Sequence, residues 1–430
     1  MTQIILEPLR GFRDILPPES RALSRLAEIF TEVAEAYGYR EVKPPTLERF
    51  QLFAVKSGEE IRRSMYVFKD KAGREVALRP EATASIARIY LKHLRGEPKP
   101  LRLYYVVNCF RYEEPQKARY REFWQAGIEL LGEPSILGDF EVIRILVKFY
   151  ERIEMLDHIV LKIGTTKLYR HLFSKYNISE DIQDHILHLM DKDLYNEAIN
   201  VLLETDSPEL ADLLEQLWSK ARNNIEEAKK ITAKASEKAA SILEEFNKLV
   251  KMLKEYNNQL RLDVDLAFAR GLAYYTGTIF EVKVPGFPVS IAGGGRYDNL
   301  IELYGGEKVP GTGFAIGLDR TLAAIQELGL SPKLVYEDKV PIAIIVLDEA
   351  LAGYAARVQD ILAAKTTVTA SMYVSPKLQK ILPKLAKQGY RYAVIIGRKE
   401  AAEAKVVLRD LLQRRQGVVS LDKLSNVEFR

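Results

Sequence analysis

The chain contains 430 residues, with 63 Lys+Arg, 59 Asp+Glu and a formal net charge of +4. At roughly 150 residues per domain, this length predicts about three domains, whose cores form without disulfides or metals. Hydrophobic residues make up 47% and charged residues 28%, which is typical of a globular protein and argues against disorder. Cys109 is the single cysteine, which excludes an intramolecular disulfide and a cysteine-based metal site.

The first residues show no targeting signal, because acidic and basic side chains interrupt the apolar ones from the start. The strongly apolar runs, such as Pro341–Leu347, are far shorter than the ~20 residues of a membrane-spanning helix. We therefore expect a cytoplasmic protein with no membrane segment.

Positive charge gathers in the last hundred residues. Residues 331–430 hold 17 Lys+Arg and 10 Asp+Glu, a balance of +7, which leaves −3 for residues 1–330. A basic end on a slightly acidic body favours a polyanionic partner, although solvated lysines on helix faces produce the same count.

The first part of the chain, residues 1–164, mixes helical and strand patterns. Residues 19–37 space their apolar positions at three and four, which predicts an amphipathic helix. Short β-rich runs follow at 76–78, 103–112 and 122–131. Their closeness and their aromatic content favour an antiparallel sheet over repeated strand–helix–strand crossovers.

Residues 165–256 are predicted to form a helical domain inserted into that sheet. Apolar residues from 225 to 253 recur at spacings of three or four as one long stripe. Strand alternation resumes at 262–268 and again at 280–284. Residues 257–328 are therefore expected to continue the first domain.

The last segment, residues 338–430, is predicted to be a small α/β domain. Pro341–Leu347 has the pattern of a buried strand, and a helix is expected up to about Ala364. A second helix around Lys377–Gln388 and a strand at Tyr392–Gly397 complete the prediction.

Several common catalytic motifs are missing from the sequence. There is no P-loop and no nucleophile elbow, and Gly311, Gly313 and Gly317 miss the dinucleotide fingerprint by one position. His185 and His188 are placed to share a helix face, but no carboxylate pattern completes a zinc motif around them. We therefore expect no protein-held metal site.

An arginine-rich segment, Cys109–Glu129, is predicted to be a hairpin with Pro115–Ala118 as its loop. Arg111 and Arg119 on the two strands would grip phosphate oxygens bidentately, and Phe123 would stack on a base. Alternatively, the arginines pair with carboxylates of the hairpin itself. These carboxylates are Glu113, Glu114 and Glu122.

Three more clusters combine arginine, aromatic residues and glycine. Arg270–Glu281 holds an arginine and two tyrosines between strands, as site groups or as part of a hairpin. Gly293–Asp298 opens with three glycines, which permit either close backbone approach to a ligand or a tight turn. Gly311–Arg320 is predicted to pass from a strand into a helix at about Leu318. Arg320 in the first helical turn would favour a bound anion.

Taken in this order, the clusters resemble the class II aminoacyl-tRNA synthetases, and specifically the histidyl-tRNA synthetase family. The hairpin is similar to motif 2, Gly311–Arg320 to motif 3, and Gly38–Thr46 to motif 1 at a dimer interface. Further segments resemble the N-terminal and histidine-specific motifs of that family. These are Arg10–Pro17, Arg270–Glu281 and Ala292–Asp298. The implied fold is an α+β catalytic domain with an antiparallel sheet flanked by helices, an inserted helical domain and a C-terminal α/β anticodon-binding domain.

The resemblance implies an enzyme that activates L-histidine with ATP and Mg²⁺ and then transfers it to tRNA(His), acting as a homodimer. Arg111 and Arg270 are implied as the catalytic arginines at the α-phosphate. The implied ATP-binding residues are Arg111, Glu113, Arg119, Phe123 and Arg320. The implied histidine-binding residues are Glu81, Thr83, Gln125, Glu129, Arg270, Tyr274, Tyr275 and Tyr297.

Two positions depart from the family pattern. Ala273 stands where many members have aspartate, which changes the support expected around Arg270. Glu114 replaces a residue that is often basic and would repel tRNA phosphates, so Gln116 is the better candidate for a tRNA contact.

The main alternative is a non-catalytic histidine-sensing paralogue, the regulatory subunit of ATP phosphoribosyltransferase. That paralogue usually lacks the anticodon-binding domain and often loses the ATP-site arginines, whereas this chain keeps both. A synthetase for another amino acid is a weaker alternative, which the Arg270 and Gly293 segments argue against.

Overall fold

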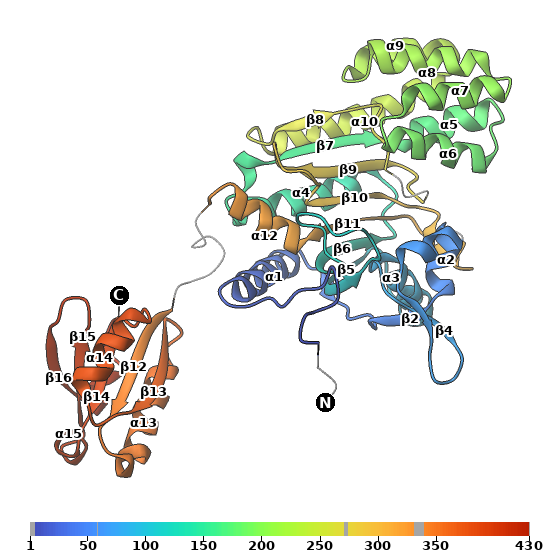
Figure 1. The fold of residues 1–430 in the computed structure, drawn as a ribbon. Helices are drawn as coiled ribbons and strands as arrows, with labels where there is room; N and C mark the ends of the chain where they lie inside the picture. Colours follow the sequence, from blue (N-terminus) through green and yellow to red (C-terminus); the bar gives the residue numbers. More distant parts are fainter. Residues whose placement is uncertain (1–4, 58, 271–273, 331–338, 430) are drawn as a thin grey trace. The chain divides into compact units, whose positions relative to one another are not determined.

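The computed structural model describes residues 5–57, 59–270, 274–330 and 339–429 (Figure 1). The chain divides into two compact units, Met1–Val335 and Tyr336–Arg430, which are described separately. Within the described ranges, no helix has the length and the apolar character needed to cross a membrane.

The described part of the first unit is built on an eight-stranded sheet with the order β1-β5-β6-β11-β10-β9-β7-β8. The interior pairs are antiparallel, as predicted, and parallel pairs occur at the two ends, between β1 and β5 and between β7 and β8. The strands are β1 Arg40–Glu41, β5 Leu101–Phe110, β6 Glu122–Leu131, β7 Val160–Thr165, β8 Leu262–Val264, β9 Thr278–Lys283, β10 Ala292–Arg296 and β11 Gly311–Gly317.

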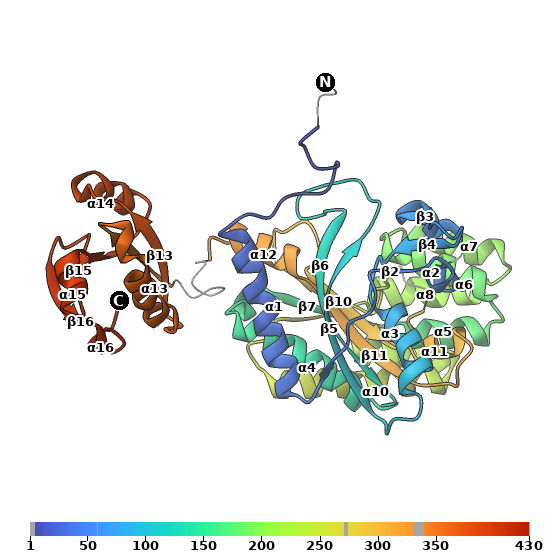
Figure 2. The same ribbon diagram turned by 90° about the horizontal axis from the view of Figure 1, so that it is seen from below.

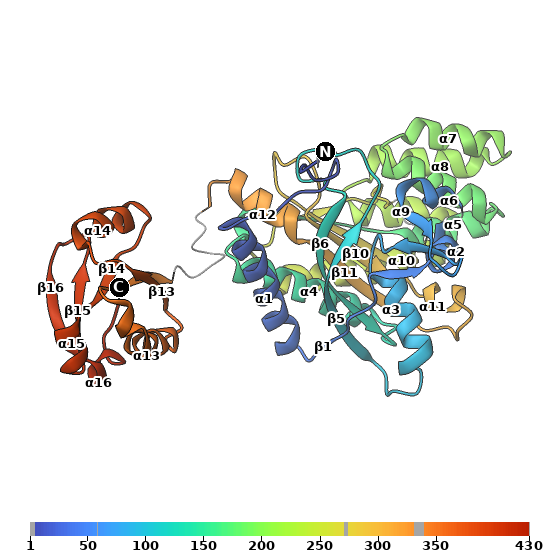
Figure 3. The ribbon, with the colours of Figure 1, turned by 60° about the horizontal axis from the view of Figure 1, so that its bottom comes forward.

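Helices cover one face of this sheet (Figures 2 and 3). The covering helices are α1 Glu19–Ala36, α4 Ile136–Arg152, which contacts β11, and α12 Leu318–Glu327, which contacts β6. The helix predicted at 19–37 is thus confirmed, and it buries Leu26 and Phe30 at a spacing of four. Tyr104 of β5 points to this face and meets Phe30 edge to face, with ring centroids 6.3 Å apart.

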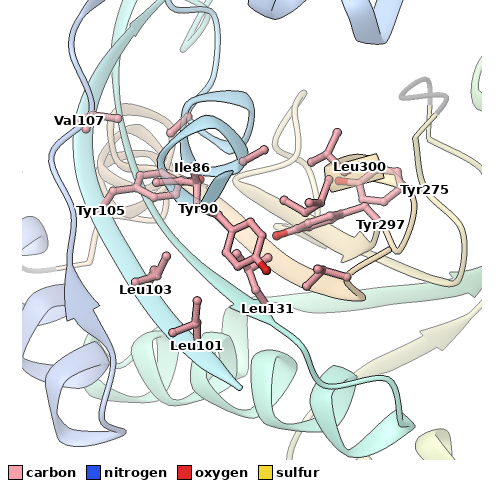
Figure 4. Close-up of a cluster of buried hydrophobic side chains, with 14 of the residues drawn as sticks. Ile86, Tyr90, Leu101, Leu103, Tyr105, Val107, Leu131, Tyr275, Tyr297 and Leu300 are labelled. Carbon is pink, nitrogen blue, oxygen red and sulfur yellow. The ribbon is translucent and has the colours of Figure 1, made fainter. Parts of the chain in front are cut away.

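The opposite face carries a cluster of buried aliphatic and tyrosine side chains (Figure 4). Alternate residues Leu103, Tyr105 and Val107 of β5 contribute to it, because successive side chains of a strand point to opposite faces. Ile86 and Tyr90 contribute from α3 Thr83–Ile89 and the turn that follows it, η2 Tyr90–Leu94. Tyr275 and Tyr297 lie in the same cluster.

A smaller three-stranded sheet among the described residues flanks α3. Its order is β2 Leu47–Arg49, β4 Glu75–Leu78 and β3 Val67–Lys69. The strand predicted at 76–78 lies in β4, but in this separate sheet and not in the sheet of the runs at 103–112 and 122–131 with which it was grouped. The short elements around it are α2 Gln51–Ser57, η1 Glu59–Ser64 and α11 Leu300–Leu303, and η3 Leu156–His158 precedes β7.

Six helices of the described chain lie between β7 and β8, where a helical segment was predicted. They are α5 Thr166–Lys175, α6 Glu180–Asp191, α7 Tyr195–Glu204, α8 Pro208–Lys220, α9 Ile225–Ala235 and α10 Glu237–Tyr256. One long helical stripe was predicted for the apolar residues from 225 to 253. In the structure these residues belong to two helices, α9 and α10. Ser236 separates them in an extended conformation (φ −159°), and its side chain accepts a hydrogen bond from the backbone N–H of Ala239.

The second unit contains, in its described part, a five-stranded sheet with the order β13-β12-β14-β15-β16. Its elements are β12 Val340–Val346, η5 Glu349–Leu351, α13 Ala352–Ala363, β13 Val368–Val374, α14 Leu378–Lys387, β14 Tyr392–Ile396, α15 Arg398–Ala402, β15 Lys405–Asp410, β16 Gln416–Ser420 and α16 Leu421–Leu424. The two predicted strands and two predicted helices are confirmed as β12, β14, α13 and α14. Both faces of β12 are buried, which explains its unbroken apolar sequence.

Candidate active site

A cavity of about 160 Å³ lies against the large sheet on the side of the tyrosine cluster. Strands β5, β6, β10 and β11 contribute lining residues, together with the start of α3 and the segment after β8. The predicted site residues that line it are Glu81, Thr83, Arg111, Phe123, Gln125, Glu129, Arg270, Tyr274, Tyr275, Tyr297 and Arg320. Residues from six separate segments of sequence therefore converge on one cavity.

The remaining predicted residues lie outside this lining. Glu113 lies 3.9 Å from Arg111 and 3.2 Å from Arg119, measured between carboxylate oxygen and guanidinium nitrogen. Gln116 is exposed, and its backbone exchanges two hydrogen bonds with that of Arg119. Ala273 lies outside the described residues.

Glycines of β10 and β11 create the room that the site side chains occupy. A Cβ atom on Gly293 would lie 1.5 Å from Nη1 of Arg270, and one on Gly313 would lie 2.1 Å from Oε2 of Glu129. Further close approaches of the same kind involve Gly295 with Tyr275 and Gly311 with Tyr297. The glycines at 293–295 thus belong to an interior strand and permit close packing, and they do not form a tight turn.

One end of the cavity is built around the carboxylate of Glu129, whose residue is only 1% exposed. Thr83 Oγ1 donates a hydrogen bond to it at 2.9 Å, Tyr105 OH donates at 3.4 Å, and Tyr297 OH donates to its second oxygen. A buried carboxylate needs such donors, because removing it from water without them is costly. Tyr105 was not predicted as a site residue. Its hydroxyl reaches Glu129 across the space that Gly127 leaves open on β6.

Three tyrosines at this end of the cavity pack ring against ring. The ring centroid of Tyr274 lies 4.8 Å from that of Tyr275 and 6.0 Å from that of Tyr297. Burial raises the pKa of all three tyrosines above the usual value of a phenol. They are therefore neutral near pH 7 and act there as hydrogen-bonding groups without charge.

Two polar side chains lie next to this group. The Glu81 carboxylate accepts hydrogen bonds from the backbone N–H groups of Thr83 (2.6 Å) and Ala84 (3.1 Å) at the start of α3. Gln125 Oε1 accepts one from Cys109 Sγ at 3.3 Å. Burial raises the pKa of Cys109 to about 12, so the thiol is protonated and donates.

The other end of the cavity carries three arginines, each held by a main-chain carbonyl oxygen. Arg111 Nε donates to Pro80 O (3.0 Å), Arg270 Nη1 to Phe280 O (3.0 Å), and Arg320 Nη1 to Ser290 O (3.1 Å). Burial, followed by repulsion from Arg111 and Arg119, lowers the pKa of Arg320 to about 10. A cluster of like charges in this state favours a bound anion.

The prediction that Arg111 and Arg119 lie on paired strands is wrong. Strand β5 ends at Phe110 and β6 begins at Glu122, and the hydrogen bond from Arg111 N to Arg121 O (2.9 Å) is followed by a loop. The loop packs instead on the N-terminal segment, where Gly11 O accepts from Arg121 N at 2.8 Å. The Arg111 guanidinium lies over the ring of Phe123, with its Cζ atom 5.3 Å from the ring centroid.

The carboxylates of this loop have separate partners. Glu113 pairs with Arg111 and Arg119. Of the three carboxylates named in the alternative interpretation, it is the one that pairs with these arginines. Glu114 pairs instead with Arg10 at 2.9 Å, on the surface. Glu122 accepts a hydrogen bond from the side chain of Asn108 at 3.0 Å.

Asp319 is a further buried group that sequence reasoning missed. Its carboxylate accepts from Arg13 Nη2 (2.9 Å) and from the backbone N–H of Trp124 (2.6 Å). Arg13 also lies over the ring of Tyr120, 4.0 Å from its centroid. The N-terminal segment thus ties the loop to the helix that carries Arg320.

The antiparallel sheet, the arginine loop and the glycine-rich strand entering α12 together define a class II aminoacyl-tRNA synthetase. A model of the histidyl-tRNA synthetase family matches residues 11–321, and a model of the anticodon-binding domain matches residues 341–427. The chain belongs to the histidyl-tRNA synthetase family. It is 42% identical to a histidine–tRNA ligase of Metallosphaera sedula over 98% of both chains.

Solved structures agree with this family and fold. The histidyl-tRNA synthetase of Nostoc sp. PCC 7120 is 25% identical, with a TM-score of 0.77 over 99% of both chains. A Bacillus halodurans protein described as an ATP phosphoribosyltransferase regulatory subunit/histidyl-tRNA synthetase is 23% identical, with a TM-score of 0.74 over 92% of this chain and 98% of that one. This second likeness shows the fold alone. The full-length match to a ligase does not favour the histidine-sensing alternative.

Proposed function

We propose that this cavity activates histidine with ATP and that the chain then transfers the histidine to tRNA(His). The observation that carries this assignment is the pairing of two unlike ends in one cavity. Buried hydroxyl groups surround a carboxylate at one end, and arginines held by carbonyl oxygens gather at the other. An amino acid with a polar side chain suits the first end, and a triphosphate suits the second.

In the first step, the histidine carboxylate attacks the α-phosphorus of ATP in line and pyrophosphate leaves. The carboxylate is already ionised at neutral pH, so the step requires positioning and positive charge and no strong base. Arg111 and Arg270 supply that charge at the α-phosphate, as preorganised donors where negative charge develops. Their anchoring to carbonyl oxygens supports this role, because it fixes the guanidinium groups without neutralising them.

The rest of ATP lies along the arginine loop. Arg119 and Arg320 hold the γ-phosphate, Phe123 stacks on adenine, and Glu113 accepts from the adenine amino group. In the described residues, no three acidic, histidine or cysteine side chains form a metal-binding group. Mg²⁺ is commonly held by substrate phosphates with few protein ligands. Mg²⁺ would accordingly be held mainly by the phosphates of ATP, where it would offset their negative charge beside the arginines.

Histidine is recognised at the other end. Glu129 and Tyr275 pair with the two imidazole nitrogens, while Tyr274 and Tyr297 close the pocket. The α-amino group is bound by Glu81, Thr83 and Gln125. A site built for two imidazole hydrogen bonds leaves buried polar atoms unpaired when any other amino acid enters, which is a strong basis for selectivity.

The tRNA is held by the second unit, which makes up most of residues 331–430 and their charge excess of +7. Phosphate contacts from its lysines and arginines orient the tRNA, and base contacts read the anticodon. Near the cavity, exposed Gln116 is the candidate contact to the acceptor end. A cytoplasmic location belongs to this proposal, because tRNA charging serves translation.

A homodimer also belongs to this proposal. Leu47, Val55 and Phe68 are 42%, 48% and 47% exposed on the small sheet and α2, next to the segment that resembles motif 1. Exposed large apolar side chains gathered in one region favour an interface.

The direct test is histidine-dependent ATP–pyrophosphate exchange by the purified chain. We expect exchange that depends on histidine and that other amino acids do not support. A folded protein that gives no exchange with histidine would refute the assignment.

The role of the second unit is tested by removing the residues after 330. Pyrophosphate exchange uses the first unit alone, so we expect it to change by less than about threefold. Charging of tRNA depends on phosphate contacts and should fall by about 100-fold or more. Equal losses in both assays would mean that the second unit only stabilises the first.

A further inference from the structure

The four residues Val264–Ala267, which precede the catalytic arginine, are held by side chains and backbone from the inserted helices. Asn223 Nδ2 donates to Val264 O at 2.7 Å, and Arg222 O accepts from Leu266 N at 2.8 Å. The Tyr169 hydroxyl donates to Leu266 O. The Tyr195 hydroxyl lies 3.4 Å from Ala267 O and 2.9 Å from Asp193 Oδ1, and its one proton is shared between these two acceptors. Successive peptide groups of one short segment are thus held from α5 and from the connection between α8 and α9, with a weaker contact from α7.

The strongest of these contacts is an ion pair. The Arg222 guanidinium donates through Nε and Nη2 to the two oxygens of Asp265, both at 2.8 Å. Asp265 is 2% exposed, and it also accepts from Lys162 Nζ at 2.7 Å and from the backbone N–H of Ala267 at 2.9 Å. Burial raises its pKa, but hydrogen bonds from Arg222 and Lys162 outweigh burial and lower it. A bidentate pair of this kind fixes orientation as well as position.

Only two residues separate this anchored segment from Arg270. Phe268 and Ala269 are 6% and 1% exposed, so the connection is packed. Arg270 then enters a narrow slot, because a single Cβ on Gly293 would collide with its guanidinium. The guanidinium makes one hydrogen bond to a carbonyl oxygen there. The position of the guanidinium therefore depends on where the anchored segment places the Arg270 backbone.

We infer that Arg222 is a positioning residue for histidine activation, acting through Asp265 on the catalytic Arg270. The inserted helices thereby contribute to the adenylation step itself. This inference rests on the proposed function, since it assumes that Arg270 contacts the α-phosphate.

The physical reason is the steep dependence of catalysis on placement. A displacement of about 1 Å at a reacting group lowers the rate by roughly 100-fold. Loss of Arg222 leaves Asp265 with Lys162 and the Ala267 N–H, so the carboxylate keeps partners and the fold survives. What is lost is the two-point attachment that sets the direction of the segment.

The test compares Arg222→Ala, the milder Arg222→Lys and a matched control, Arg170→Ala. Arg170 donates to Gln183 at 3.1 Å and pairs with Asp184 at 2.5 Å, both on α6 inside the same helical segment. We expect Arg222→Ala to lower kcat of pyrophosphate exchange by about 10- to 100-fold, with KM for ATP and histidine within about twofold. Arg222→Lys should give an intermediate loss, and the control should match the original chain.

A double-mutant cycle separates positioning from simple stability. Single-turnover adenylate formation at high enzyme concentration is measured for Arg270→Ala with and without Arg222→Ala. If Arg222 acts through Arg270, the second change should cost less than about twofold in this background. An equal loss in both backgrounds, or an unchanged kcat in the single variant, would overturn the inference. Absence of exchange in the original chain would refute the proposed function instead.

Discussion

The two ends of the cavity hold their charged side chains in opposite ways. At one end, Glu129 is buried and hydroxyl groups of Thr83, Tyr105 and Tyr297 donate to it. At the other end, the arginines are held by carbonyl oxygens, and Arg320 has a lowered pKa because of burial and its arginine neighbours. The first end is internally satisfied, and the second retains an excess of positive charge.

This difference corresponds to two kinds of work. A satisfied network of buried hydrogen bonds favours selectivity, because a wrong ligand must break bonds that it does not replace. A cluster with an excess of positive charge gains most when a polyanion binds and when negative charge develops in the transition state.

The largest effect is expected from Arg270→Ala. Removing one preorganised donor from a developing negative charge costs about 10²- to 10³-fold in rate, and we expect the upper end here because the site uses no base. Single-turnover adenylate formation measures the loss, and circular dichroism checks the fold. A rate within a few-fold of the original would show that this arginine is misassigned.

Gly293→Ala attacks the same arginine without removing it. The new methyl group would occupy the position of the Arg270 guanidinium, and the three atoms nearest to it belong to that side chain. We expect a loss of about 100-fold in kcat from displacement of the charged group. Gly353→Ala is the matched control, because a Cβ atom there meets nothing within 4 Å. A Gly293→Ala enzyme with normal kcat would contradict the slot model.

Glu129→Gln breaks the other end. The amide keeps one acceptor oxygen but loses the charge, and hydrogen bonds to charged groups contribute about 1.5–3 kcal/mol. We expect kcat/KM for histidine to fall by about 10- to 100-fold, with KM for ATP unchanged. Equal effects on both substrates would mean that the two ends are not independent.

The fold was predictable where one pattern dominates a segment. Helix α1 and strand β12 are clear from spacing and from an unbroken apolar run. Strand β16 was missed because its residues are largely exposed and give no alternation. The break at Ser236 was missed because apolar spacing continues across it, while an N-cap acts through one backbone angle and one hydrogen bond.

The site was predictable as chemistry but not as geometry. Motif order brought Arg111, Arg270 and Arg320 together before the sheet was known. Tyr105 and Asp319 were missed because their roles depend on neighbours distant in sequence, through strand register and helix packing. No local pattern marks such residues, since any tyrosine on a strand or aspartate in a first helical turn has the same appearance.

The smallest effect tests whether the arginine end costs stability. Burial and neighbouring arginines lower the pKa of Arg320 to about 10, so its charged form is disfavoured in the folded protein. At pH 7 Arg320 is protonated in both folded and unfolded states, and the full cost is present. As pH rises through about 10, the folded protein releases this proton first and the cost declines. Arg320→Gln should therefore raise the unfolding temperature of the ligand-free protein at pH 7 by roughly 2 °C, and by less near pH 10. If Arg320 holds the γ-phosphate as proposed, the same variant should raise KM for ATP by about tenfold, because that phosphate loses a charged donor. Differential scanning fluorimetry at the two pH values, with pyrophosphate exchange alongside, measures both effects. A variant that binds ATP poorly and is also less stable would show that Arg320 supports the fold. The two ends would then still differ in chemistry, but repulsion among the arginines would not lower the stability of the folded protein.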